Sequence, residues 1–234
     1  MSEYLNNTYQ AKIDACLKAV NMLGVSVKKI VKKYRSQIMP DSSISREDLF
    51  EGIMDKNPTR DHFDYVTNKC NLVHHMDSRT AFEYGVDLIL GWIIEDAAIL
   101  ALSQNGQVAV LSGEDRYREF LNPRKISTQP DIRLSIKGRD RFIEIFADWK
   151  GTWGKQNHAD LRDNKYNKLL QENAILFGIS PIDQTGFVID MEVERDLFVE
   201  GFIPAYRKQG FIFKGIRSRL EPLNVAVSKI VSPA

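Results

Sequence analysis

Apolar residues in the first 36 positions recur at intervals of three and four. The series includes Ile13, Leu17 and Ile30, and Gly24 falls within it. Such intervals place the apolar side chains on one face of a helix. We therefore expect one helix over residues 9–36, or two helices that are broken near Gly24.

A second helix is predicted over residues 79–103, and it is apolar on nearly every face. Glu95 and Asp96 are the only charged residues in its apolar centre. A helix with this pattern is expected to run through the core rather than along the surface. Before it, a weak capping signal at Ser45 predicts a short helix, and residues 58–71 are expected to form a loop.

After Asn105-Gly106 the period of the apolar positions shortens to two, the alternation that is typical of β-strands. Strands are expected over residues 107–111, 131–136, 141–150, 174–180, 185–191 and 211–216. Helices are expected over residues 159–173 and 195–209, and residues 137–140 are interpreted as the turn of a hairpin. This order predicts an α/β fold of mixed α+β character, in which a central mixed β-sheet is flanked by helices.

Charge and cysteine content narrow the classes of function. The 234 residues include 32 Lys and Arg and 31 Asp and Glu, which gives a net charge of +1. This balance argues against a polybasic packaging protein, but it allows a nucleic-acid enzyme whose basic cleft is offset by acidic residues. Cys16 and Cys70 lie 54 positions apart and outside any CxxC pattern. They support neither a disulfide scaffold nor a zinc site, and they fit a reducing, cytoplasmic location.

No internal repeat or flexible linker divides the chain. We therefore expect a single domain over 1–234, with a mainly helical N-terminal region over 1–77 and a core over 78–234. The apolar stretch over 88–102 is too short and too charged to span a bilayer, and the chain opens without an apolar signal segment. No membrane partner is expected.

The strand expected over 141–150 carries polar groups on one side only. Side chains that alternate along a strand point to opposite faces of the sheet. One side is wholly apolar and consists of Ile143, Ile145, Ala147 and Trp149. Asp148 and Lys150 lie on the other side together with Glu144, for which an ion pair with Arg141 or another neighbour is the favoured role. The hairpin is expected to bring Asp131 close to Asp148.

Two neighbouring carboxylates repel each other unless a cation lies between them, and Mg²⁺ prefers such oxygen ligands. We therefore expect a metal site at Asp131 and Asp148. Lys150 on the same face would orient or deprotonate a metal-bound water, or neutralise charge on a phosphate. This combination suits the hydrolysis of a phosphodiester.

Pro130-Asp131, followed 17 residues later by Asp148-Trp149-Lys150, resembles the signature of the PD-(D/E)xK nuclease superfamily. This superfamily includes most type II restriction endonucleases as well as resolvases and repair nucleases. The resemblance covers roughly half of the chain and implies a restriction-endonuclease-like core: a helix with an acidic residue, a three-stranded meander, a helix and a further strand. Trp149 is bulkier than the residue that usually occupies the middle of this motif.

The resemblance also implies a helix acid and a metal. Glu95 fits the helix acid best, and Asp96, Asp87 and Glu83 are the alternatives. The main-chain carbonyl of Trp149 would supply a further ligand to Mg²⁺, for which Mn²⁺ could substitute.

A glycine-rich tract over residues 151–158 leaves the expected catalytic strand. Its side chains are of the kinds that stack on bases or bind nucleic acid. The residues expected to contact DNA are Trp153, Lys155, Gln156 and Asn157.

These observations lead to one expectation about function. It is a Mg²⁺-dependent endonuclease that acts on double-stranded DNA, specifically a type II restriction enzyme that works as a homodimer, because cleavage of both strands at a palindrome needs two sites related by a twofold axis. The alternatives are a resolvase or repair nuclease of the same superfamily, and a DNA-binding module without activity.

Overall fold

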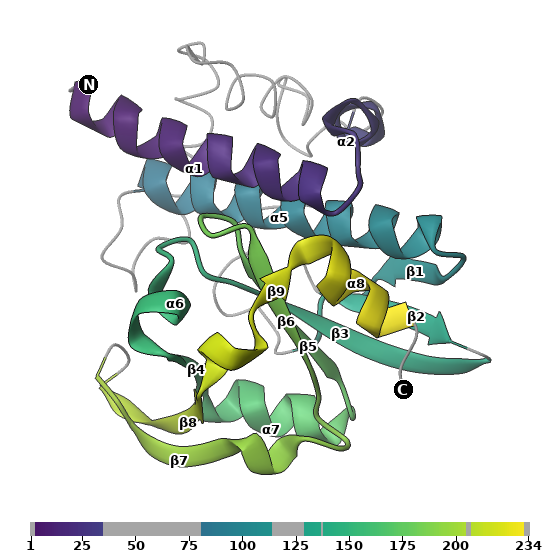
Figure 1. The fold of residues 1–234 in the computed structure, drawn as a ribbon, viewed down its shortest axis with the longest axis vertical. Helices are drawn as coiled ribbons and strands as arrows, with labels where there is room; N and C mark the ends of the chain where they lie inside the picture. Colours follow the sequence, from purple (N-terminus) through teal and green to yellow (C-terminus); the bar gives the residue numbers. More distant parts are fainter. Residues whose placement is uncertain (1–2, 35–80, 114–128, 137, 205–206, 232–234) are drawn as a thin grey trace.

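The computed structural model describes residues 3–34, 81–113, 129–136, 138–204 and 207–231 (Figure 1). The helix expected after Ser45, the loop expected over 58–71 and the second cysteine, Cys70, lie outside these residues. The described residues form a mixed α/β structure with a large mixed β-sheet, as expected from the sequence.

The large sheet has six strands in the order β1-β2-β3-β5-β6-β9. Their bounds are Val108–Leu111 for β1, Ile132–Ile136 for β2, Arg139–Ala147 for β3, Ile175–Ser180 for β5, Thr185–Asp190 for β6 and Glu221–Pro222 for β9. β3 and β5 are parallel, and every other neighbouring pair is antiparallel. Every residue of β5 is buried, which explains why its sequence is an apolar run rather than an alternation.

Helices cover one face of this sheet. They are α1 (Glu3–Met22), α2 (Val27–Tyr34), α5 (Ala81–Gln104) and α8 (Leu223–Val231). α5 lies against the sheet, and α1 packs on the outer side of α5 (Figure 1). The helices and the sheet enclose a first core that includes Ile30, Ile94, Leu102 and Ile143. The predicted break near Gly24 and the predicted core position of the second helix are both confirmed.

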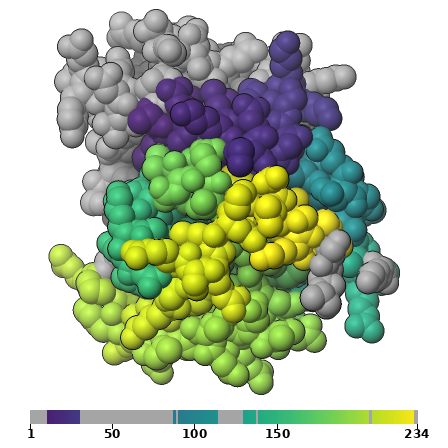
Figure 2. Space-filling model, in the orientation of Figure 1, coloured from purple at the N-terminus to yellow at the C-terminus, as the bar shows by residue number. Residues whose placement is uncertain are grey.

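A smaller antiparallel sheet lies on the other face of the large sheet, in the order β4-β8-β7. It consists of β4 (His158–Arg162), β7 (Phe198–Ile203) and β8 (Lys208–Lys214), and it packs with α7 (Asp163–Gln171) around a second core. Tyr166 of α7 stacks on Phe211 of β8, with 3.6 Å between the ring centroids. The C-terminal segment lies on the surface between the N-terminal helices and the β7–β8 hairpin (Figure 2).

Several sequence predictions about elements need correction. Residues 158–162 form a strand and only 163–171 form the expected helix. Residues 198–203 of the helix expected over 195–209 form strand β7, which follows the short 3₁₀ helix η3 (Arg195–Leu197). The tract after β3 forms the short helix α6 (Thr152–Gln156), and a second 3₁₀ helix, η4 (Ile216–Arg219), follows β8. β3 ends at Ala147, before the motif residues that were expected to close it. Among the described residues, no helix combines the length and apolar character needed to cross a membrane.

Candidate active site

The register of the β2–β3 hairpin decides which carboxylates meet. Ile132 of β2 pairs with Ile143 of β3, so Asp131, one position before Ile132, lies beside Glu144, one position after Ile143. Oδ2 of Asp131 accepts a hydrogen bond of 2.8 Å from the main-chain N–H of Ile145. The prediction that the hairpin pairs Asp131 with Asp148 is therefore wrong, because Asp148 lies four positions after Glu144, beyond the end of β3.

Glu144 is a buried carboxyl group with an ammonium partner. The residue is 8% exposed, and its Oε2 lies 2.6 Å from Nζ of Lys165, in the first turn of α7. Arg141, the partner considered from the sequence, instead pairs with Asp190 at 2.7 Å. The structure thus brings Asp131, Glu144 and Lys165 together from three different elements of the chain.

Burial raises the pKa of Glu144 from 4.5 to about 7. The nearby Lys165 ammonium and a side-chain hydrogen bond with Asp131 lower the pKa of Glu144, while the charge of Glu95 raises it further. The desolvation of the carboxylate outweighs its ion pair, since a buried charge loses its hydration. Glu144 therefore exchanges its proton near neutral pH.

The helix acid expected from the sequence, Glu95, approaches this group from α5. Its charge acts on Glu144, and the residue is half-buried. Among the alternatives, Asp87 is paired with Lys12 of α1 at 2.6 Å, and Asp96 is buried at 1% exposure. The side chain of Glu83 lies outside the described part of the chain.

Asp148 has a structural role in the turn after β3. Its Oδ1 accepts hydrogen bonds from the Lys150 N–H at 3.1 Å and the Thr152 hydroxyl at 3.0 Å, and its Oδ2 accepts one of 2.8 Å from the Trp153 N–H. The bond from Trp153 satisfies an N–H group at the start of α6 that has no partner within the helix. Both carboxylate oxygens are thus engaged by the turn.

The remaining motif residues lie in the same turn, beyond the end of β3. The Lys150 side chain is exposed, and the Trp149 side chain packs against the first core. The main-chain carbonyl of Trp149, which was expected to bind metal, therefore belongs to a turn five positions past Glu144. The second half of the sequence motif, residues 148–150, therefore lies apart from the carboxylate pair, whereas Asp131 belongs to both.

The residues expected to contact DNA divide into two groups. Trp153 is 3% exposed and packs against Phe146 and Phe187, with ring centroids 5.2 Å and 5.0 Å away. It cannot stack on a base from this position, so that prediction is wrong. Asn157 ends α6 in the left-handed conformation and accepts a hydrogen bond from the Arg217 N–H. Lys155 and Gln156 are exposed and remain available to a ligand.

The carboxyl pair fits a hard cation. Two carboxyl groups that share a hydrogen bond must hold either a proton or a cation between them, and their oxygen atoms are the ligands that Mg²⁺ prefers. Among the residues that the structure describes, no three side chains of His, Cys, Asp or Glu gather as a metal centre. A cation held by Asp131 and Glu144 would therefore take its other ligands from water and main-chain oxygens, as Mg²⁺ commonly does.

Sequence reasoning missed Glu144 and Lys165 as site residues. The sequence carried one signal for Glu144, which is the glycine at position 138, a residue that tight hairpin turns favour. In the structure Gly138 has a φ of 78°, and the strands pair as far as Ile136 and Arg139. The pairing of Ile136 with Arg139 sets the register that places Asp131 beside Glu144. Lys165 gave no such signal, because its position depends on how α7 packs on the large sheet. The chain matches no model of a known protein family, and it matches no curated protein.

Proposed function

We propose that the chain is a metal-dependent nuclease that hydrolyses phosphodiester bonds of double-stranded DNA. The observation that carries this proposal is the buried Glu144–Lys165 ion pair beside Asp131. Two carboxyl groups and an ammonium at one place are the groups that metal-assisted phosphodiester hydrolysis needs. The resemblance of the sequence motif and of the order of elements to the PD-(D/E)xK superfamily favours the same reaction.

The proposed roles follow from the contacts. Asp131 and Glu144 hold the cation, and Glu95 adds negative charge that favours its binding. When bound there, Mg²⁺ would neutralise charge on the phosphate and make a bound water more acidic. Lys165 takes the role that the sequence suggested for Lys150: its ammonium orients the attacking water and stabilises charge that develops on the phosphate oxygens. Asp148 and Lys150 shape the turn beside the site.

The finer assignment is a type II restriction enzyme with a restriction-endonuclease-like core, acting as a homodimer in the cytoplasm. Its support is the resemblance and the symmetry of a palindromic duplex, which calls for two sites related by a twofold axis. Size-exclusion chromatography with light scattering tests the dimer, for which a mass twice that of the chain is expected. A purely monomeric protein on duplex DNA would contradict this assignment without affecting the proposed chemistry.

Cleavage of supercoiled plasmid and linear phage DNA in Mg²⁺ tests the proposed reaction. We expect discrete fragments from the wild-type protein and none in excess EDTA. Glu144→Gln and Lys165→Gln should each lower the cleavage rate by about 100-fold or more, because each removes a group that acts on the reacting phosphate.

Helix α7 supplies the matched controls. Lys168 and Glu172 form an ion pair of 2.5 Å within the helix, on partly exposed side chains. Lys168→Gln and Glu172→Gln should cleave at the wild-type rate, because surface pairs of this kind contribute little. Wild-type cleavage by Glu144→Gln and Lys165→Gln would contradict the proposal. Loss of cleavage in Lys150→Gln alone would instead identify Lys150, and not Lys165, as the catalytic lysine.

A further inference from the structure

The face of the large sheet that points away from α5 is covered over only part of its width. Ile132 and Leu134 of β2 point into the first core, so the residues that alternate with them point to the opposite face. Over β5 and β6 that face is covered by the second core. Over β1 it is exposed to solvent, since Val108 and Val110 are 68% and 42% exposed. We call this uncovered part the open face, and its residues on β1 and β2 are Val108, Val110, Arg133 and Ser135.

The candidate site lies at the border of the open face. Arg133 pairs with Phe142 across the β2–β3 hairpin, and Asp131 and Glu144 lie two positions away from this pair. The carboxyl groups and Arg133 therefore project to the same side of the sheet, about 7 Å apart along the strand. Lys165 and the second core close the site on the side of α7. A long substrate that reaches the carboxyl pair across the open face therefore passes over Arg133.

Arg133 offers a positive charge that the fold does not use. Its side chain is exposed, and it makes no hydrogen bond or ion pair with the other residues that the structure describes. An arginine guanidinium stays charged, and its planar N–H groups match two oxygens of one phosphate. Asp140 projects to the same side, but it pairs with Ser135 and lies further from the carboxyl pair than Arg133 does. The position nearest to the site is therefore the one that attracts an anion.

We propose that Arg133 binds a phosphate of the DNA strand next to the phosphate that is held at the carboxyl pair. The guanidinium donates to two oxygens of that phosphate, and Val110, which pairs with Arg133 on β1, packs against the adjoining sugar. Such a contact fixes the register of the strand over the site without reading its sequence. The choice of a DNA strand rests on the proposed function, whereas the exposed guanidinium beside the carboxyl pair is a feature of the fold.

The salt dependence of DNA binding tests this contact without any cleavage step. Anisotropy of a fluorescently labelled duplex is measured with the full-length protein in EDTA, from about 50 to 200 mM NaCl. Arg133→Gln should bind the duplex about 5–10-fold more weakly at the lowest salt concentration and should reduce the slope of log K against log[NaCl] by about 1, because one phosphate contact is lost. Arg133→Lys should keep most of the slope, since an ammonium also displaces a counterion from the phosphate.

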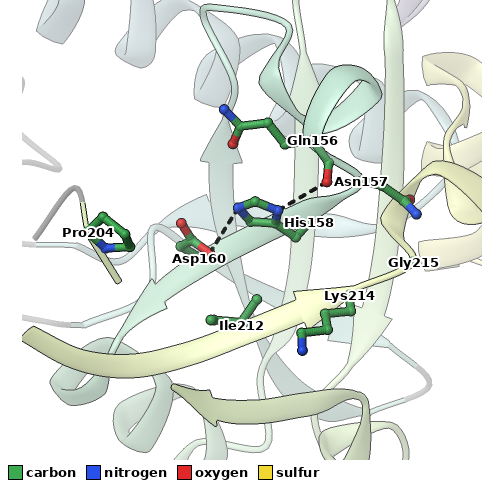
Figure 3. A pocket seen from close by; sticks show the side chains of 8 residues that line it. All are labelled: Gln156, Asn157, His158, Asp160, Pro204, Ile212, Lys214 and Gly215. Carbon is green, nitrogen blue, oxygen red and sulfur yellow. Dashed lines mark hydrogen bonds and ion pairs between the residues drawn. The ribbon is translucent and has the colours of Figure 1, made fainter. Parts of the chain in front are cut away.

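Two further variants remove one positive charge elsewhere. Arg139 lies in the same hairpin, but it pairs with Ile136 on the side of the first core. Lys214 lines a pocket of the small sheet, beside the ion pair of His158 and Asp160 (Figure 3). Arg139→Gln and Lys214→Gln should keep the wild-type slope, although each changes the net charge as much as Arg133→Gln does.

Three outcomes would overturn the proposal. They are a wild-type slope in Arg133→Gln, an equal reduction of the slope in all three glutamine variants, which would be an effect of net charge alone, and no binding of the duplex by the wild-type protein. The test is also distinct from that of the proposed function. A slope that depends on Arg133 in a protein that cleaves no DNA in Mg²⁺ would refute the nuclease and keep the contact. Cleavage by a protein whose slope is independent of Arg133 would do the reverse.

Discussion

Glu144 is buried beside a charged partner, and these two factors shift its pKa in opposite directions. Its carboxyl group lies between Lys165 and Asp131, but the loss of hydration raises its pKa from 4.5 to about 7. The ionised form is therefore less favourable in the folded chain than in the unfolded chain. Perturbed pKa values of this kind are common at functional sites.

The pH dependence of stability follows from this shift. Between about pH 4.5 and pH 7 the folded protein keeps a proton on Glu144 that the unfolded chain has released, so the free energy of unfolding falls as the pH rises. The full loss is on the order of 3 kcal/mol. Urea unfolding without metal, between pH 5 and pH 8, should show this decline.

Two variants isolate the contribution of Glu144 to that decline. Glu144→Gln should flatten the pH dependence and unfold at higher urea concentration than the wild type at pH 8, because the amide needs no proton. Glu172→Gln should keep the wild-type decline, since Glu172 is on the surface of α7. An unchanged slope in Glu144→Gln would show that other groups cause the decline.

At the scale of elements, the turn from β3 into α6 depends on one carboxylate. Asp148 is 6% exposed and accepts three hydrogen bonds from the turn and from the first residues of α6. Gly151, the residue before α6, has a φ of 62°, a conformation that favours glycine. Together these two residues turn the chain from the large sheet towards the small one.

Asp148→Ala should lower the free energy of unfolding by about 1–3 kcal/mol, because it leaves buried N–H donors without an acceptor. The variant should still gain thermal stability from Mg²⁺, since in the proposed site the cation is held by Asp131 and Glu144. Thermal melts with and without Mg²⁺ measure both effects. Unchanged stability combined with loss of the Mg²⁺ effect would identify Asp148 as a metal ligand after all.

At the scale of the whole molecule, an aromatic cluster joins the two sheets. Trp153 of α6 contacts Phe146 of β3 and Phe187 of β6, and Phe187 in turn packs near Phe213 of β8, with 5.8 Å between ring centroids. Gly178 on β5 leaves the space that the Phe187 ring fills, because a Cβ there would lie 2.0 Å from Cε1 of that ring. The second core therefore holds α6 and the small sheet against the large sheet.

Trp153→Ala should lower the free energy of unfolding by about 3–5 kcal/mol, as expected for a large buried aromatic side chain. Trp153→Phe should cost less, because the ring contacts are partly kept. Lys155→Ala, on the exposed side of α6, is the control and should leave stability nearly unchanged. Chemical denaturation measures all three, and a stable Trp153→Ala protein with weakened DNA binding would restore the base-stacking role predicted from the sequence.

The sequence by itself determined the features that depend on local periodicity. Helices α1, α2 and α5, the β2–β3 hairpin and the apolar strands β5 and β6 follow from patterns in which neighbours along the chain decide the structure, whereas helix α8 was not predicted. The same patterns failed for residues 158–162 and 198–203. Both segments are strands that form only because β8 pairs with each of them, and short segments take on structure through such partners.

The candidate site shows the same division. Asp131 was found from the sequence, and the approach of Glu95 was expected from the family resemblance. The neighbour of Asp131 depended on a hairpin register that shifts by whole residues with the length of the turn. The sequence did not indicate Lys165, because 21 positions separate it from Glu144. The packing of α7 in the folded chain brings its ammonium to 2.6 Å from that carboxylate. Tertiary structure decided this contact, since burial and charge pairing act between residues that the chain order keeps apart.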